Sequence, residues 1–134
     1  PVNLEELLRS ADIISLNSFL DENSYHMIGE KEFSLMKKGV FIVNTARGAL
    51  MEEKSLIKAL DDGVIGGIGL DVLEGEPINE NHPLLKYENV VITPHTSAYT
   101  YECLKGMGDK VVDDVERVLR GEVPDNLINK DILK

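Results

Sequence analysis

The chain has 134 residues, of which 43% are hydrophobic and 28% are charged, and its formal net charge is −10. This size and composition are typical of one compact globular domain with its own core. The acidic balance, in which Lys37-Lys38 is the densest basic spot, argues against partners such as nucleic acid or an anionic membrane. The single Cys103 cannot form an internal disulfide, and no apolar run reaches transmembrane length, so we expect a cytoplasmic protein.

The predicted elements alternate between helices and strands. The first half of the chain predicts a helix from Asn3 to Ala11, a strand at Ile13–Leu16, a helix at Glu30–Lys37 ended by Gly39, and a strand at Val40–Val43. The second half predicts a helix at Glu52–Leu60, strands at Ile65–Leu70 and Val90–Thr93, and a long helix at Thr100–Arg120. This order favours an α/β fold with a parallel, doubly wound, Rossmann-type sheet. The strand at Val40–Val43 is almost wholly apolar, which predicts burial on both faces of the sheet.

A glycine-rich run, Gly63 to Gly69, forms the third predicted strand. It is not a dinucleotide fingerprint, because that motif follows a strand and opens a helix. We expect these glycines to admit a neighbouring helix or a ligand closely. The G-x-G-x-x-G turn is absent from the whole sequence.

Three short motifs follow predicted strands and bring Arg47, Glu76 and His95 to the carboxyl edge of the sheet, where open α/β folds bind ligands. The guanidinium of Arg47 can hold a carboxylate, and His95 can act as a general acid–base near neutral pH. Each residue alone has a plainer reading: a surface ion pair for Arg47, solvation for Glu76 and a loop hydrogen bond for His95. We expect all three to converge on one cleft. His26 and His82 lie in other loops and are interpreted as structural, so the histidines predict no metal site.

The motifs N-T-A-R-G, G-L-D-V-L-E-G-E-P, N-H-P-L-L and V-V-I-T-P-H-T occur in that order. Together the motifs resemble the D-isomer-specific 2-hydroxyacid dehydrogenases, and most of all their D-lactate dehydrogenase branch. The resemblance implies NAD as cofactor and a small 2-keto or 2-hydroxy acid as substrate. It implies that Arg47 anchors the substrate carboxylate and that His95, hydrogen-bonded to Glu76, exchanges the proton.

The family's cofactor contacts fall on six further positions and on two of the residues already named. The set implied by the resemblance is Ser18, Phe19, Ser24, Thr45, Ala46, Arg47, Asp71 and His95. The segment Asn17-Ser18-Phe19 stands where family members often carry His-Val-Pro, so the adenosine side of the pocket differs in this chain.

Family members are about twice this length or more, so we expect the chain to be a C-terminal part of such an enzyme. Residues 1–120 then form the second half of the NAD-binding domain, and residues 121–134 return to the substrate domain. We expect this part alone to be inactive and the whole enzyme to be a homodimer. Two other functions fit the fold. A catalytically silent NAD(H)-sensing regulator can keep all three residues, whereas a formate dehydrogenase type carries an amide in place of Glu76.

Overall fold

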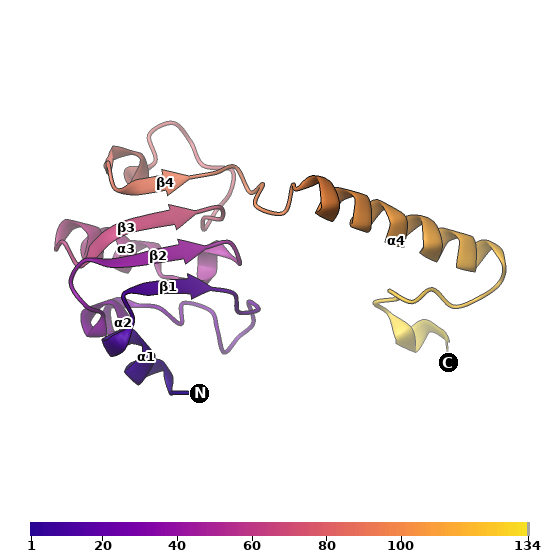
Figure 1. Cartoon of the computed structure of the whole chain (residues 1–134), viewed down its shortest axis with the longest axis horizontal. Helices are drawn as coiled ribbons and strands as arrows, with labels where there is room; N and C mark the ends of the chain where they lie inside the picture. The colour runs from indigo at the N-terminus through magenta and orange to yellow at the C-terminus, as the bar shows by residue number, and fades with distance from the viewer. Residues whose placement is uncertain (134) are drawn as a thin grey trace. The chain divides into compact units, whose positions relative to one another are not determined.

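The computed structural model describes residues 1–133, and its contacts divide the chain into two compact units, Pro1–Ser97 and Ala98–Lys134. The first unit contains a four-stranded parallel sheet whose strands lie in chain order (Figure 1). The strands are β1 (Ile13–Leu16), β2 (Val40–Asn44), β3 (Ile65–Leu70) and β4 (Val90–Ile92). The predicted α/β fold with a parallel sheet is therefore confirmed. The predicted division at residue 120 concerns the two domains of a whole enzyme and stays a prediction.

Helix α1 (Leu4–Ser10) precedes β1, α2 (Glu30–Leu35) connects β1 to β2, and α3 (Glu53–Asp61) connects β2 to β3. Short 3₁₀ turns, η1 (Gly48–Leu50) and η2 (Pro83–Lys86), lie in the connections after β2 and β3. The prediction for α2 was two residues too long, because Met36 is already extended and packs its side chain into the core. Gly39, at φ +85°, makes the turn into β2 and does not end the helix.

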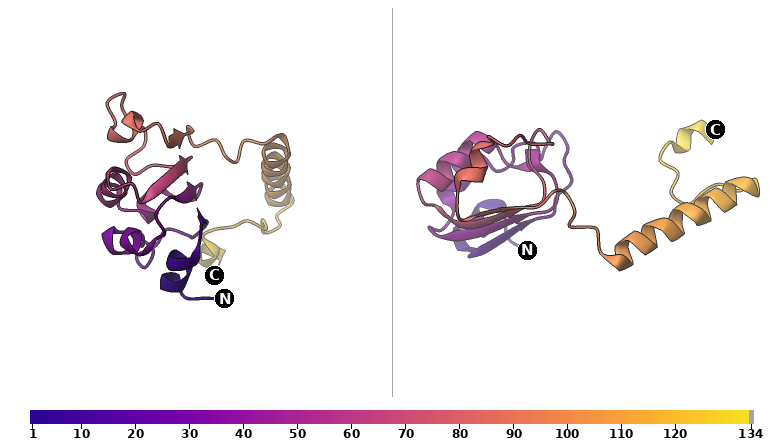
Figure 2. Two further views of the ribbon diagram at one scale, coloured as in Figure 1. Left: turned by 60° about the vertical axis from the view of Figure 1, so that its left-hand side comes forward. Right: turned by 90° about the horizontal axis from the view of Figure 1, so that it is seen from above.

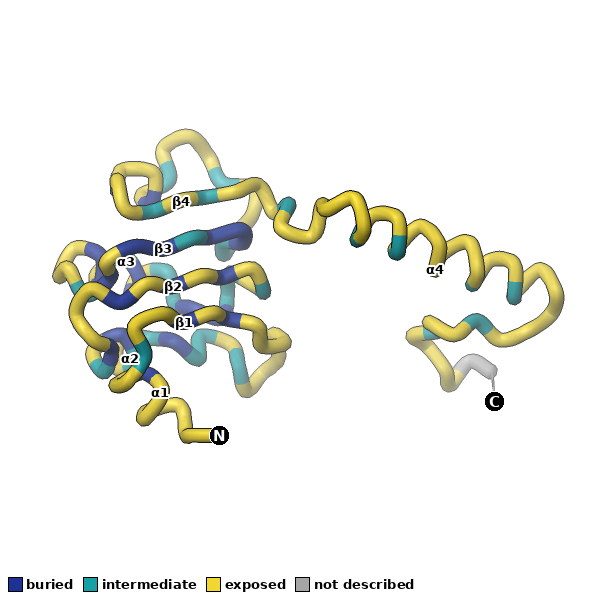
Figure 3. Tube along the Cα trace, in the orientation of Figure 1, coloured by how far each residue is buried: buried dark blue, intermediate teal, exposed yellow. Residues whose placement is uncertain are grey.

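Helices α2 and α3 stack together on one face of the sheet (Figure 2). Their apolar side chains and the inward residues of the strands form the core, which includes Phe33, Ile42, Leu56 and Leu70. Burial alternates along β2, and the opposite face of the sheet leaves apolar side chains exposed (Figure 3). The exposed residues on the strands are Ile13, Phe41, Val43 and Val91. The prediction of burial on both faces was therefore wrong for this chain, since helices of the described first unit cover only one face.

Two glycines of β3, Gly66 and Gly67, make room for neighbours in β2 and in the turn before it, whereas the Cβ position of Gly69 has no neighbour within 4 Å. A Cβ atom at Gly66 would lie 2.5 Å from the carbonyl oxygen of Gly39. A Cβ atom at Gly67 would lie 2.8 Å from the aromatic ring of Phe41. Gly66 and Gly67 therefore serve the packing of β3 against β2 and the turn that precedes it, and the close approach of a ligand to this strand stays a prediction.

The second unit consists of α4 (Tyr101–Leu119), a tail and the short turn η3 (Lys130–Leu133). Thr100 caps α4 by accepting a hydrogen bond from the N–H of Cys103. The tail folds back on the helix, since Asp114 accepts hydrogen bonds from the backbone of Asp125 and the amide of Asn126. Within this unit the predicted apolar stripe of α4 is present but exposed.

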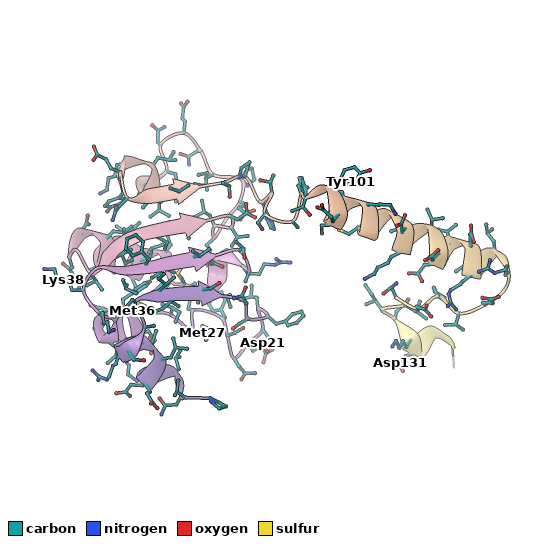
Figure 4. All side chains as sticks on the ribbon, in the orientation of Figure 1. Asp21, Met27, Met36, Lys38, Tyr101 and Asp131 are labelled. Carbon is teal, nitrogen blue, oxygen red and sulfur yellow. The ribbon has the colours of Figure 1, made fainter. Side chains whose placement is uncertain are left out.

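All four strands run in the same direction and end at the same edge of the sheet (Figure 1). The loop after β1 lies at this carboxyl edge, whereas Lys38 lies at the opposite edge, as the labelled side chains of Asp21 and Lys38 show (Figure 4). The segments that carry the predicted site residues therefore start from one edge.

Candidate active site

The predicted contact between Glu76 and His95 forms. Nδ1 of His95 lies 2.9 Å from Oε2 of Glu76, and the two side chains are 51% and 35% exposed. His95 follows β4 after Thr93-Pro94, and Glu76 lies in the long loop after β3. Because Nδ1 faces a carboxylate, Nε2 is the ring nitrogen left for proton exchange.

The second oxygen of the Glu76 carboxylate is fixed by the backbone. Oε1 accepts a hydrogen bond of 2.6 Å from the N–H of Leu73. Burial alone would raise the pKa of Glu76, but the hydrogen bonds from Leu73 and His95 favour the ionised form and hold the pKa below its ordinary value. Glu76 is therefore a carboxylate with one oxygen bound to its own loop and the other to His95.

Asp71 holds the turn that presents His95. Its carboxylate is buried and accepts hydrogen bonds from the hydroxyl of Thr93 at 2.5 Å, from the N–H of Thr96 at 2.8 Å and from the N–H of Ser97 at 2.9 Å. Burial raises the pKa of this group, yet the three donors outweigh it and hold the pKa of Asp71 well below its usual range. The carboxylate oxygens of Asp71 thus bind residues before and after His95 in the chain. The backbone of His95 itself is left-handed, at φ +56°.

A cleft of about 560 Å³ lies beside this pair of residues, and we call it the acid–base cleft. It is lined by Asp71, Leu73, Glu76, Pro77, Ile78, Ile92, Thr93, Pro94 and His95. Apolar side chains make up much of this wall, and the ionisable groups Glu76 and His95 lie beside them while remaining partly exposed. Such an arrangement suits proton transfer to a small polar molecule.

Arg47 lines a different hollow, of about 320 Å³, which we call the Arg47 hollow. Its lining residues are Asn17, Ser18, Phe19, Leu20, Thr45, Ala46 and Arg47. Arg47 does not line the acid–base cleft, and its convergence with Glu76 and His95 on one substrate stays a prediction. Arg47 follows β2 beside the loop after β1, whereas Glu76 follows β3 and His95 follows β4.

Asn44, which sequence reasoning treated only as part of a motif, shapes the turn that carries Arg47. Asn44 is fully buried; its amide donates to the carbonyl of Arg47, and its oxygen accepts from the N–H of Ala46. The signal was available, because asparagine after a strand often closes a turn with its side chain.

Gly48 joins the Arg47 turn to the loop that carries Glu76. A Cβ atom at Gly48 would lie only 2.0 Å from the carbonyl carbon of Leu73 and 2.3 Å from the nitrogen of Glu74. Only glycine allows this approach. The two halves of the candidate site are therefore packed against each other through backbone, although their side chains line separate hollows.

Most of the predicted cofactor residues lie together. Ser18, Phe19, Thr45 and Ala46 line the Arg47 hollow, and Phe19 is 94% exposed. Ser24 does not line it; its hydroxyl donates to the carbonyl of Phe19 and accepts from the N–H of Asp21, so it shapes the loop. The carboxylate of Asp71 is hydrogen-bonded to the turn around His95. Their roles toward a cofactor stay predictions.

The donors around the Arg47 hollow fit part of a nicotinamide nucleotide. Hydroxyl groups of Ser18 and Thr45, the exposed ring of Phe19 and the cation of Arg47 offer hydrogen bonds, a stacking surface and positive charge. A glycine turn for the pyrophosphate is not part of this sequence.

The described residues include no helix that is long and apolar enough to cross a membrane. Among the same residues, no three histidine, cysteine, aspartate or glutamate side chains gather as a metal site would require. The two remaining histidines each bind a glutamate: His26 pairs with Glu74 at 3.1 Å and His82 with Glu53 at 3.3 Å. The structural role expected for both histidines stays a prediction.

Comparison with known proteins identifies the domain. Residues 1–97 match the family described as "D-isomer specific 2-hydroxyacid dehydrogenase, NAD binding domain". The chain belongs to this family. NAD is therefore the cofactor of this domain, as the resemblance implied.

The relatives of this dehydrogenase domain carry several names. The chain is 45% identical over 133 residues to a glyoxylate reductase of Korarchaeum cryptofilum, covering 99% of this chain and 40% of the relative. It is 44% identical over 127 residues to a D-3-phosphoglycerate dehydrogenase of Methanocaldococcus jannaschii, covering 95% of this chain and 24% of the relative. The chain thus spans less than half the length of the relatives it matches.

A solved structure shares the fold over most of the chain. The NAD-complexed D-isomer specific 2-hydroxyacid dehydrogenase of Lactobacillus delbrueckii ssp. bulgaricus superposes with a TM-score of 0.86 at 35% identity. The match covers 95% of this chain and 43% of that structure. The dehydrogenase family and its NAD-binding fold thus rest on sequence and structure alike.

Proposed function

We propose that this chain supplies the acid–base site and part of the NAD site of a dehydrogenase that reduces a small 2-keto acid to its D-2-hydroxy acid. The observation that carries this proposal is the hydrogen bond between Glu76 and His95 at the carboxyl edge of a sheet from the NAD-binding family. A histidine backed by a carboxylate is suited to donating a proton and taking it back.

His95 protonates the substrate oxygen in this proposal. NADH, when bound, supplies the hydride that reaches the carbonyl carbon of the keto acid. The carbonyl π electrons move to oxygen, and that oxygen takes the proton from Nε2 of His95. Glu76 keeps Nδ1 protonated and balances the positive charge that the imidazolium carries before it gives up its proton. In the reverse direction His95 takes the proton from the hydroxyl group.

Arg47 holds the carboxylate of the substrate in this proposal, because its planar guanidinium binds both carboxylate oxygens at once. Its side-chain nitrogen Nη1 donates to the carbonyl of Ala46, which leaves four further N–H donors for a ligand. The residues that would hold the cofactor beside it are Ser18, Phe19, Thr45 and Ala46.

The substrate that we propose is unbranched and of glyoxylate or pyruvate size. Names of relatives support this size, since they include glyoxylate reductase and, among the solved structures, D-lactate dehydrogenase of Lactobacillus jensenii. The D-lactate activity expected from the sequence is one form of this proposal. A homodimer and a cytoplasmic location also remain proposals.

Oxidation of NADH by the intact protein tests the function. We expect turnover with glyoxylate, pyruvate or hydroxypyruvate and none with acetaldehyde, which has no carboxylate for Arg47 to bind. NADH binding without turnover of any 2-keto acid would favour the NAD(H)-sensing regulator instead.

A further inference from the structure

The loop Glu74-Gly75-Glu76 is held by two histidines, one at each glutamate. Nε2 of His26 lies 3.1 Å from each carboxylate oxygen of Glu74, and Nδ1 of His95 lies 2.9 Å from Glu76. Gly75, between the glutamates, has φ +77°, a conformation that other residues rarely adopt. The chain thus reverses at Gly75 and turns its two carboxylates to different partners.

His26 is itself held firmly. Its N–H donates to the carbonyl of Ala49 at 2.8 Å, and its ring stacks on that of Tyr25 with centroids 3.9 Å apart. The hydroxyl of Tyr25 donates to Glu74 as well, at 3.3 Å. The backbone of His26 is left-handed at φ +50°, which a non-glycine residue keeps only when its surroundings fix it.

Several acidic side chains lie near His26, but the described hydrogen bonds of its ring go to one of them, Glu74. Glu52, Glu53, Lys54 and Glu74 line the hollow beside His26, and the described contacts join its ring to Glu74 alone among them. The imidazole and carboxylate are 27% and 35% exposed, so solvent screens this pair less than it screens a fully exposed one. The contact spans 48 positions in the sequence and fixes the base of the Glu76 loop from one side.

The other side of that base is fixed by backbone packing. Gly48 lies against Leu73 and Glu74, and the N–H of Leu73 binds Glu76. Glu74 is the residue at which these restraints meet, two positions before the group that binds His95.

We infer that His26 is a positioning residue for the Glu76–His95 pair and acts through Glu74. The inference rests on the proposed function for its kinetic consequence, but the restraint itself can be measured without turnover. His26 does not line the acid–base cleft, and its effect passes through the loop.

His26→Asn removes the bond and tolerates the left-handed backbone, because asparagine adopts it more readily than most residues. His26→Gln keeps an amide donor of longer reach and should restore the bond in part. Glu74→Ala breaks the same bond from a partly exposed loop position, which keeps the experiment decisive if a His26 variant fails to fold. His82→Asn is the matched control, since it breaks a histidine–glutamate pair, His82 with Glu53, that makes none of the described hydrogen bonds to Glu74, although Glu53 lines the same hollow.

The first measurement is the carboxyl ¹³C titration of Glu76 by NMR. We expect its pKa to rise in His26→Asn and in Glu74→Ala, because a looser loop weakens the bonds that favour the carboxylate. A pure charge effect gives the opposite direction in Glu74→Ala, since removing a nearby negative charge lowers the pKa of Glu76. The control His82→Asn should leave the titration unchanged.

The second measurement is the steady-state kinetics of the intact protein. We expect kcat to fall about tenfold in His26→Asn with little change in KM, and to recover to within about threefold in His26→Gln. In the double variant His26→Asn/Glu74→Ala, kcat should fall no further than in either single variant, because the two residues act through one bond. An unchanged Glu76 titration and kcat in both single variants, or a fall in the Glu76 pKa in Glu74→Ala, overturns the inference. If no 2-keto acid is reduced, the proposed function fails while the NMR titration still decides the role of His26.

Discussion

Nδ1 of His95 lies 2.9 Å from the carboxylate of Glu76, although the two residues are 19 positions apart and belong to different loops. The contact exists because β3 and β4 are parallel neighbours whose carboxyl ends meet at one edge. Asp71 fixes the His95 turn, and Leu73 fixes Glu76. The Glu76–His95 pair is therefore built on restraints that lie within one unit of the chain.

Glu76→Gln tests the role of the carboxylate. An amide cannot balance an imidazolium, so we expect kcat/KM for 2-keto acid reduction at neutral pH to fall about 10- to 100-fold. The measurement is the steady-state rate of NADH oxidation by the intact protein. Glu80→Gln, an exposed change in the same loop, is the control and should keep the wild-type kcat/KM.

The lowered pKa of Glu76 also predicts a dependence of stability on pH. A carboxyl whose folded pKa lies below its unfolded value stabilises the fold above the unfolded pKa, and this contribution is lost as the pH falls through the folded value. Glu76→Gln should therefore flatten the fall in stability below about pH 4.5. Denaturant unfolding at a series of acidic pH values measures the free energy of unfolding. If that free energy falls with pH as steeply in Glu76→Gln as in the wild type, the hydrogen bonds of the Glu76 carboxylate do not stabilise the fold.

Arg47→Lys tests the carboxylate anchor. Lysine keeps the charge but loses the planar fork, so we expect KM for the keto acid to rise about tenfold or more while NADH affinity changes little. Fluorescence titration with NADH and steady-state kinetics of the intact protein give the two numbers. Arg9→Lys, in an exposed helix ion pair with Glu5, serves as the control. Unaltered KM in Arg47→Lys would remove Arg47 from the substrate site.

Asp71→Asn tests the buried carboxylate behind His95. The amide can accept fewer hydrogen bonds than the three donors require, so we expect a loss of about 2 kcal/mol or more in the free energy of unfolding. Because the pKa of Asp71 is depressed, its contribution is present above about pH 4 and declines as the pH falls further, so the variant should differ most from wild type near neutral pH. Urea unfolding checks this, with the exposed Asp12→Asn as the comparison. Equal losses in the two variants would contradict the role given to Asp71.

Much of the first unit could be predicted from the sequence, because apolar β-branched strands and strand-end motifs are local signals. The strand ends predicted that Glu76 and His95 lie at one edge of the sheet, and the family resemblance implied the hydrogen bond between them. The bonds from His26 to Glu74 and from Thr93 to Asp71 could not be predicted, since each depends on loops that meet only after folding. The exposed face of β2 was missed for a related reason: a run of apolar residues does not say which neighbours are present to cover it.

The 134-residue chain on its own should bind NADH weakly or not at all, because its sequence contains no glycine turn of the kind that binds pyrophosphate. Titration calorimetry of the isolated chain with NADH measures this. Micromolar affinity would show that the residues around the Arg47 hollow supply most of the binding energy.

The most direct test of the account is the His95→Asn variant of the intact protein. Asparagine has no group that exchanges a proton near neutral pH, and it tolerates the left-handed backbone at this position. We expect NADH to bind with nearly wild-type affinity in fluorescence titrations while kcat for 2-keto acid reduction falls by about 100-fold or more. A variant that binds NADH and keeps its wild-type kcat would contradict the assignment of His95 as the proton donor.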